Sequence, residues 1–169
     1  MPMARTHARD THARGRTSAR HNAINLLKGD HKEVKSMVEE FKKSRSDSKK
    51  ADLAENICSA LEVHARIEEE IFYPAAREAL RSSDEELIDE AQVEHGSVKE
   101  MIAKIKSATP GDAMWEAEVK VLGEYVNHHV REEEGEIFPK LRKTSMDMDE
   151  IGEQLQQRKS ELMGMDGGE

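Results

Sequence analysis

Apolar residues recur along this chain at intervals of three and four, the spacing that places them on one face of an α-helix. The first such stripe runs through residues 23–43. Its members are Ile24, Leu27, His31, Val34, Val38 and Phe41. His31 stands where an apolar residue would otherwise lie, and a polar cluster at 44–48 ends the segment. The pattern predicts an amphipathic helix with one inward-facing histidine.

A second stripe begins near Lys49 and continues into a run of charged residues. Its members are Leu53, Ile57, Leu61 or Ala60, His64, Glu68, Ile71 and Ala75. Pro74 interrupts the pattern. Because proline lacks an amide N–H and its ring clashes with the preceding turn, we expect a kink or an early helix end there. The predicted inward face carries a histidine and, one turn later, a glutamate.

The third and fourth stripes repeat this design. Ser83 and Glu86 have the spacing of a capping box and are expected to open the third helix. Its stripe is Leu87 or Ile88, Ala91, His95, Val98, Met101 or Ile102, and Ile105. After a break at 109–112, the fourth stripe is Trp115, Val119, Leu122, Val126, His129, Glu133, Ile137 and Leu141. On this phase His128 is rotated by about 100° from the buried face. In the acidic runs 68–70 and 132–134, every glutamate except Glu68 and Glu133 is expected in solvent.

Four amphipathic helices joined by short polar breaks predict an all-α fold, an antiparallel up-down-up-down four-helix bundle. A weaker pattern at 148–162 predicts a short C-terminal fifth helix. We expect a disordered basic tail at 1–21, the four-helix domain at 22–143, and a polar C-terminal helix and tail at 144–169.

Charge and composition narrow the class of protein. The chain has a net charge of −9, yet residues 1–20 hold five arginines and one aspartate. The acidic remainder argues against nucleic-acid binding, because phosphate binding needs basic groups. No apolar run is long enough to predict a membrane span. The single cysteine, Cys58, cannot form an intramolecular disulfide and fits a reducing cytoplasm; in an apolar pattern we expect it to be a buried structural thiol.

The two halves of the chain are related to each other. DHKEVKSMV, from Asp30, is matched by EHGSVKEMI, from Glu94, and HARIEEEIFYP, from His64, is matched within HHVREEEGEIFP. When Pro74 is aligned with Pro139, His64 falls on His129. The repeat therefore selects His129, not His128, as the inward-facing histidine.

The predicted core thus receives six polar residues: His31, His64, Glu68, His95, His129 and Glu133. One histidine on an apolar stripe is more often a core residue with a polar partner than a metal ligand. Four histidines on four helices with two buried carboxylates are better explained by metal, because ionised glutamates are almost never buried unless paired or metal-bound. This donor set suits iron, manganese or zinc, and six ligands suit two ions that keep open positions.

The motifs DHKEVKSM, HARIEEEIFYP, EHGSVKEM and HHVREEEGEIFP resemble the hemerythrin-like HHE cation-binding family over residues 22–143. The resemblance implies a four-helix bundle around an oxo- or hydroxo-bridged non-heme di-iron centre. It also implies that the six core residues are the iron ligands.

One departure affects the expected function. Oxygen-carrying hemerythrins have a further histidine at the position of Lys99, and they end with His-x-x-x-x-Asp where this chain has His129 and Glu133. A position on one iron is therefore expected to be open, or to be filled by solvent or another side chain, with Tyr125 a candidate. The missing histidine argues against a function limited to reversible oxygen carriage.

The leading hypothesis is a di-iron protein that binds O₂ or a related small molecule such as nitric oxide or peroxide. The alternatives are an enzyme that decomposes peroxide or reduces nitric oxide at the same site, and an iron or oxygen sensor. Iron storage is disfavoured, because ferritin-type sites use Glu-x-x-His and this chain has His-x-x-x-Glu in both halves.

Overall fold

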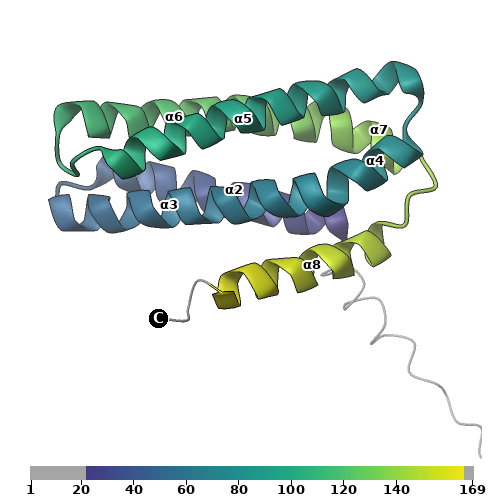
Figure 1. The fold of residues 1–169 in the computed structure, drawn as a ribbon, viewed down its shortest axis with the longest axis horizontal. Helices are drawn as coiled ribbons and strands as arrows, with labels where there is room; N and C mark the ends of the chain where they lie inside the picture. The colour runs from purple at the N-terminus through teal and green to yellow at the C-terminus, as the bar shows by residue number, and fades with distance from the viewer. Residues whose placement is uncertain (1–21, 166–169) are drawn as a thin grey trace, which may run out of the picture.

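The computed structural model describes residues 22–165, and the tail predicted for residues 1–21 lies outside this range. Four long helical rods form the bundle, as predicted (Figure 1). The first is α2 (Ala23–Lys43), and the second is α3 (Asp47–Ile67) continued by the π-helical turn η1 (Glu68–Phe72) and α4 (Tyr73–Ala79). The third is α5 (Glu85–Ser107), preceded by the 3₁₀ turn η2 (Ser82–Asp84). The fourth is α6 (Ala113–Glu132), continued by the π-helical turn η3 (Glu133–Ile137) and α7 (Phe138–Arg142).

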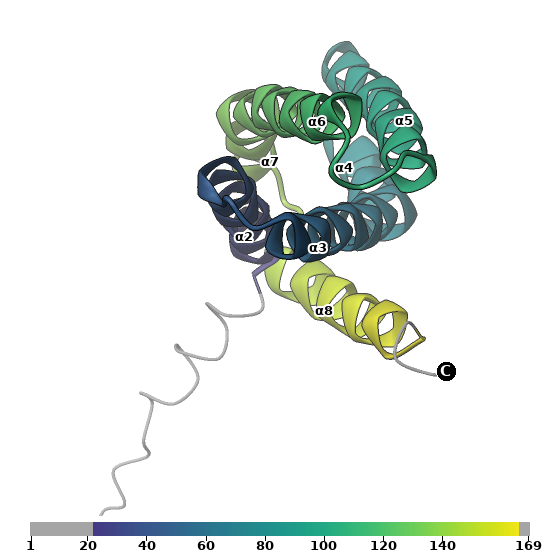
Figure 2. The ribbon, with the colours of Figure 1, turned by 90° about the vertical axis from the view of Figure 1, so that its left-hand side faces the viewer.

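The fifth helix is also present, as α8 (Met148–Met165). It lies outside the square of four rods, against α2 and α3 (Figure 2). Its residues Leu155 and Leu162 are buried and pack against the core cluster that contains Ile24, Phe72 and Phe138. Among residues 22–165 no helix has the length and apolar character needed to cross a membrane.

The helix ends agree in part with the sequence. Asn22 caps α2, since its side-chain oxygen accepts hydrogen bonds from the N–H groups of Ile24 and Asn25 at 3.1 and 3.3 Å. The capping box predicted for the third helix is wrong. Asp84 is the N-cap of α5 and makes no side-chain cap hydrogen bond, because the preceding 3₁₀ turn bonds through its backbone instead.

Of the two outcomes predicted at Pro74, a kink or an early helix end, the early end is wrong. The rod neither ends nor restarts there; it widens into a π turn in which the Tyr73 N–H bonds to the Glu68 carbonyl, five residues back. The wider turn lets the chain pass a proline that offers no N–H. It also shifts the buried face by one residue, so that Phe72 and Ala76 are buried in place of the predicted Ile71 and Ala75. The second half repeats this arrangement before Pro139.

The core is divided into two apolar clusters. One includes Ile24, Phe72 and Phe138 and lies at the end covered by α8. The other includes Phe41 and Trp115, whose ring centroids are 5.5 Å apart, and it also contains Cys58. Burial raises the pKa of the Cys58 thiol to about 11, in keeping with a structural thiol. The layer between these clusters is polar.

Candidate metal centre

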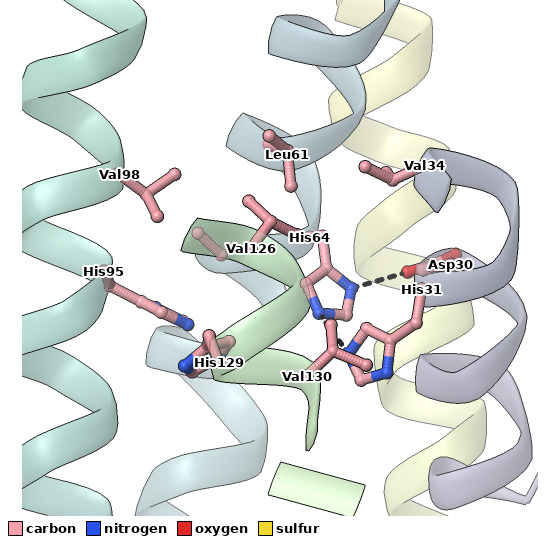
Figure 3. Close-up of a pocket in the computed structure, with 11 residues that line it drawn as sticks. Asp30, His31, Val34, Leu61, His64, His95, Val98, Val126, His129 and Val130 are labelled. Carbon is pink, nitrogen blue, oxygen red and sulfur yellow. Dashed lines mark hydrogen bonds and ion pairs between the residues drawn. The ribbon is translucent and has the colours of Figure 1, made fainter. Parts of the chain in front are cut away.

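All six residues predicted to face inward are buried and come together in the layer between the two apolar clusters. Glu68 and Glu133 are 0% and 1% exposed, and the four histidines are no more than 7% exposed. One histidine comes from each rod. Figure 3 shows His31 and His64 side by side, facing His95 and His129. The geometry forms two groups of close ligand atoms: His31, His64 and Glu133, and Glu68, His95 and His129.

Each buried glutamate spans the two halves of the chain. The Glu68 Oε1 atom lies 2.8 Å from Nε2 of His64 and 3.5 Å from Nε2 of His95. Glu133 places one oxygen 3.4 Å from Nε2 of His129 and the other 3.2 Å from Nε2 of His31. Glu68 therefore contacts one histidine of each group through a single oxygen, whereas Glu133 contacts one histidine of each group through separate oxygens.

The donor atoms fit a metal site better than a closed hydrogen-bond network. Several inward-facing buried atoms make no hydrogen bond of good geometry: both oxygens of Glu68, Oε1 of Glu133 and Nε2 of His129. Unpaired buried polar atoms are costly, and a buried carboxylate without a partner especially so. Bound cations would satisfy the inward-facing oxygens and nitrogens.

A carboxylate faces the outer nitrogen of every histidine. Asp30 and Glu94 accept from Nδ1 of His64 and His129 at 2.9 and 3.0 Å. Glu134 and Glu69 lie 3.7 and 3.5 Å from Nδ1 of His31 and His95, which is ion-pair distance. Hydrogen-bonded carboxylates such as Asp30 and Glu94 fix the tautomer and ring orientation of metal-binding histidines.

These outer carboxylates correct the sequence prediction. Glu69 and Glu134 were expected simply in solvent, yet their side chains are only 27% and 34% exposed and face the centre's histidines. Asp30 and Glu94 are the acidic residues that come directly before the repeated histidines His31 and His95. That repeat is the sequence signal from which their role as histidine partners could be predicted. Lys159 of α8 holds the other oxygen of Asp30 at 2.5 Å, a contact that no local pattern indicates.

Tyr73 is the tyrosine at this centre, and the sequence interpretation missed it. Its hydroxyl donates to Glu133 Oε2 at 2.8 Å and lies 3.1 Å from Nε2 of His95. The predicted candidate, Tyr125, packs with the apolar cluster instead, and its ring lies 6.5 Å from that of His128. The π turn explains the error, because it rotates Tyr73 onto the buried face.

Lys99 points away from the ligand atoms. Its Nζ lies 2.8 Å from both carboxylate oxygens of Glu69, and its side chain is 54% exposed. The Lys99 ammonium thus binds Glu69, the carboxylate that faces Nδ1 of His95. The group that lies near Nε2 of His95 is the hydroxyl of Tyr73.

The charges of the metal-free centre are strongly coupled. Burial by itself opposes ionisation of Glu133, but interaction with His129 and His31 holds the pKa of Glu133 well below its ordinary value. Burial likewise opposes protonation of His129, yet Glu133 and Glu68 raise its pKa to about 9. Burial, followed by the charges of Glu68 and Glu133, raises the pKa of Tyr73, so its hydroxyl keeps its proton and donates.

A small apolar cavity borders the four histidines. It has a volume of about 20 Å³. Its aliphatic lining includes Val34, Leu61, Val98, Val126 and Val130, and Figure 3 shows the first four on one side of the imidazole rings. The space suits one small molecule of about the size of water or a diatomic gas.

Comparison with known proteins agrees with this site. The model of the hemerythrin HHE cation-binding domain matches residues 22–141. A DNA nickase from a Nostoc species is 30% identical over 122 residues, which cover 72% of this chain and 34% of the nickase, so the chain spans about a third of that relative's length. A crystal structure of a hemerythrin HHE cation-binding domain-containing protein from Mycobacterium kansasii matches with a TM-score of 0.72 at 24% identity, covering 85% of this chain and 88% of that one. At that identity the likeness shows the shared fold.

Proposed function

Because this chain belongs to the hemerythrin HHE cation-binding family, we propose that it holds two non-heme iron ions and binds O₂, nitric oxide or peroxide beside them. An oxo or hydroxo bridge would join the ions. The ligands in this proposal are His31, His64 and Glu133 for one ion and Glu68, His95 and His129 for the other. Imidazole and carboxylate donors without thiolate favour such a metal over a soft one.

The position of the two buried glutamates is the main support. Glu68 lies between His64 and His95, and Glu133 lies between His129 and His31. A single structural zinc needs only four protein ligands, and would leave buried donors of this set unpaired. Two ions use all six residues and account for both carboxylates.

The residues around the centre define what can bind there. Aliphatic side chains line the small cavity beside the histidines, so an uncharged diatomic molecule is accommodated better than an ion. Tyr73 offers a hydroxyl between His95 and Glu133, where it can act as a further ligand or as a proton donor. Iron at this position would supply the electrons and the open coordination sites that O₂ or nitric oxide needs.

An enzyme acting on peroxide or nitric oxide is the alternative function, and the position of the Tyr73 hydroxyl between Glu133 and His95 is the observation that favours it. The nickase activity of the Nostoc relative is not part of the proposal, because a chain with a net charge of −9 repels a phosphate backbone.

Metal analysis combined with optical spectroscopy tests the proposal. Protein produced with adequate iron should contain about two irons per chain, as in other carboxylate-bridged bundle sites, and should show ferric charge-transfer bands that bleach on anaerobic reduction. One zinc per chain without redox-active metal would refute it. Steady consumption of peroxide or nitric oxide beyond one equivalent would favour the enzyme.

A further inference from the structure

The two halves of the bundle differ on their outer faces. On the first half, the side chains of Leu26, Val63 and Ile71 join the apolar cluster that contains Leu155 and Leu162 of α8. Figure 2 shows α8 lying along this side, next to α2 and α3. Lys159 of α8 also pairs with Asp30, the outer partner of His64. The helix α8 therefore covers part of the outer face of the first half.

The repeat places polar residues at the matching positions of the second half. Aligning His31 with His95 and His64 with His129 pairs Leu26 with Glu90, Val63 with His128, Ile67 with Glu132 and Ile71 with Glu136. All four apolar positions of one half are thus acidic or histidine in the other. A solvated helix face explains charge here, but it does not explain why the charges surround an opening.

A cavity of about 50 Å³ lies among these residues. Its lining includes Glu90, Glu94, Glu132, Glu136, Glu133 and His129. Glu90 and Glu136 are exposed, Glu94 and Glu132 are half-buried, and Glu133 is 1% exposed. The cavity therefore leads from solvent to a carboxylate of the centre.

Two buried atoms that could bind a metal, and that make no hydrogen bond of good geometry, belong to residues on the inner side of this cavity. They are Nε2 of His129, a residue 6% exposed, and Oε1 of Glu133. Both residues also line the cavity. The cavity thus reaches two of the residues proposed to hold iron.

A separate group of ligand atoms lies beside the outer part of this cavity. His128 Nε2 is 3.2 Å from Glu132 Oε1 and 3.6 Å from Glu94 Oε2. One ligand atom from each of the three residues lies within 4.8 Å of the others. The second oxygen of Glu94 accepts from His129 Nδ1 at 3.0 Å, so Glu94 links this group to the centre.

We propose that Glu94, His128 and Glu132 form a second cation site, which captures a divalent transition-metal ion and delivers it through the acidic cavity to the centre. One imidazole and two carboxylates suit Fe²⁺, Co²⁺ or Zn²⁺. The half-exposed position favours weak, reversible binding, and the surrounding carboxylates concentrate cations at the opening. This inference rests on the proposed metal centre. It concerns the rate at which the centre takes up metal ions, and not the number of ions that the centre finally holds.

The test measures cobalt uptake by metal-free full-length protein. Co²⁺ reports its own binding by visible absorption and needs no oxygen chemistry. The variant His128→Ala/Glu132→Gln should take up Co²⁺ more slowly by roughly tenfold, at the low end of the effect of focused charge on association rates. After a weak chelator has removed loosely bound Co²⁺, the remaining tightly bound content should equal that of the wild type, and circular dichroism should show the same helicity.

Glu39→Gln is the matched control. Glu39 is exposed on α2 and its substitution removes the same net charge, so its uptake rate should stay close to that of the wild type. Equal rates in the double variant and the wild type would overturn the inference, as would equal slowing by Glu39→Gln. Loss of final content in the double variant would also overturn it, by making these residues part of the centre. Failure of the proposed function appears separately, as a wild-type content other than two tightly bound ions per chain after the same chelator step.

Discussion

Tyr73 and Phe138 occupy equivalent positions in the two halves, one residue before Pro74 and Pro139, and both rings lie against a histidine of the other half. The Phe138 ring stacks on His31 with an interplanar angle of 6°, and the Tyr73 ring lies 5.3 Å from that of His95. Only Tyr73 adds a hydroxyl, which bonds to Glu133. The centre is therefore chemically asymmetric although the backbone repeats.

Removing this hydroxyl tests its role. Tyr73→Phe should lower the free energy of unfolding of the metal-free protein by about 1–3 kcal/mol, because Glu133 loses a buried hydrogen bond. If Tyr73 binds iron, the loaded variant should also lose a phenolate-to-iron absorption band. Urea denaturation and visible spectra measure the two effects. Tyr125→Phe, on a ring outside the centre, should leave the spectrum unchanged; loss of the band there instead would restore Tyr125 as the ligand.

The adjacent histidines 128 and 129 should respond differently to substitution. His129 is 6% exposed with Nε2 facing Glu133, whereas the side chain of His128 is 58% exposed. His129→Ala should lower metal affinity by more than the roughly 10–100-fold typical for loss of an outer partner. His128→Ala should leave the content of tightly bound metal unchanged. Metal analysis after dialysis against a graded series of chelator concentrations measures both, and equal losses would contradict this assignment.

The sequence predicted the rods and the six inward-facing residues because both follow from helical periodicity and the internal repeat. Periodicity assumes a constant turn, so it could not foresee the π turns, and it placed Ile71 where Phe72 is buried. Contacts between distant segments were also beyond it. Lys159 reaches Asp30 across 129 positions of the chain, and only the packing of α8 brings them together.

Packing between α2 and α6 gives a prediction about stability. A Cβ atom added to Gly123 would lie 2.6 Å from Cγ1 of Val38, and a β-branched side chain has little freedom to move away. Overpacking of this kind costs about 1–3 kcal/mol, which should exceed the gain of about 1 kcal/mol from helix propensity. Gly123→Ala should therefore lower the free energy of unfolding.

The control for this substitution is Gly96→Ala. Gly96 is exposed on α5, and an added Cβ would meet nothing within 4 Å. Only the propensity gain applies, so Gly96→Ala should stabilise the protein by roughly 0.5–1 kcal/mol. Thermal or urea unfolding of both variants gives the comparison. Equal stabilisation by both would mean that α2 and α6 separate easily.

The histidines of the centre should make metal binding and metal-free stability depend on pH in opposite directions. Burial disfavours the imidazolium of His129, but Glu133 and Glu68 raise its pKa from 6.5 to about 9. The pKa of His64 is also raised, since Glu68 and Asp30 outweigh its burial. A raised pKa stabilises the folded state fully below the unfolded value of 6.5, and this contribution is lost as pH rises toward 9.

The metal-free protein should therefore unfold at lower urea concentration at about pH 9 than near pH 6.5, the interval between the raised and ordinary pKa values of His129. The lowered pKa of Glu133 does not reverse the sign, because its contribution is fully present above 4.5. A cation binds only deprotonated imidazole, so metal affinity should rise over the same interval as protons are released. Urea unfolding and chelator competition at both pH values measure the two trends. His128→Ala leaves the buried pairs intact and should preserve both; metal-free stability that increases toward pH 9 would show that the buried histidines are neutral before metal binds.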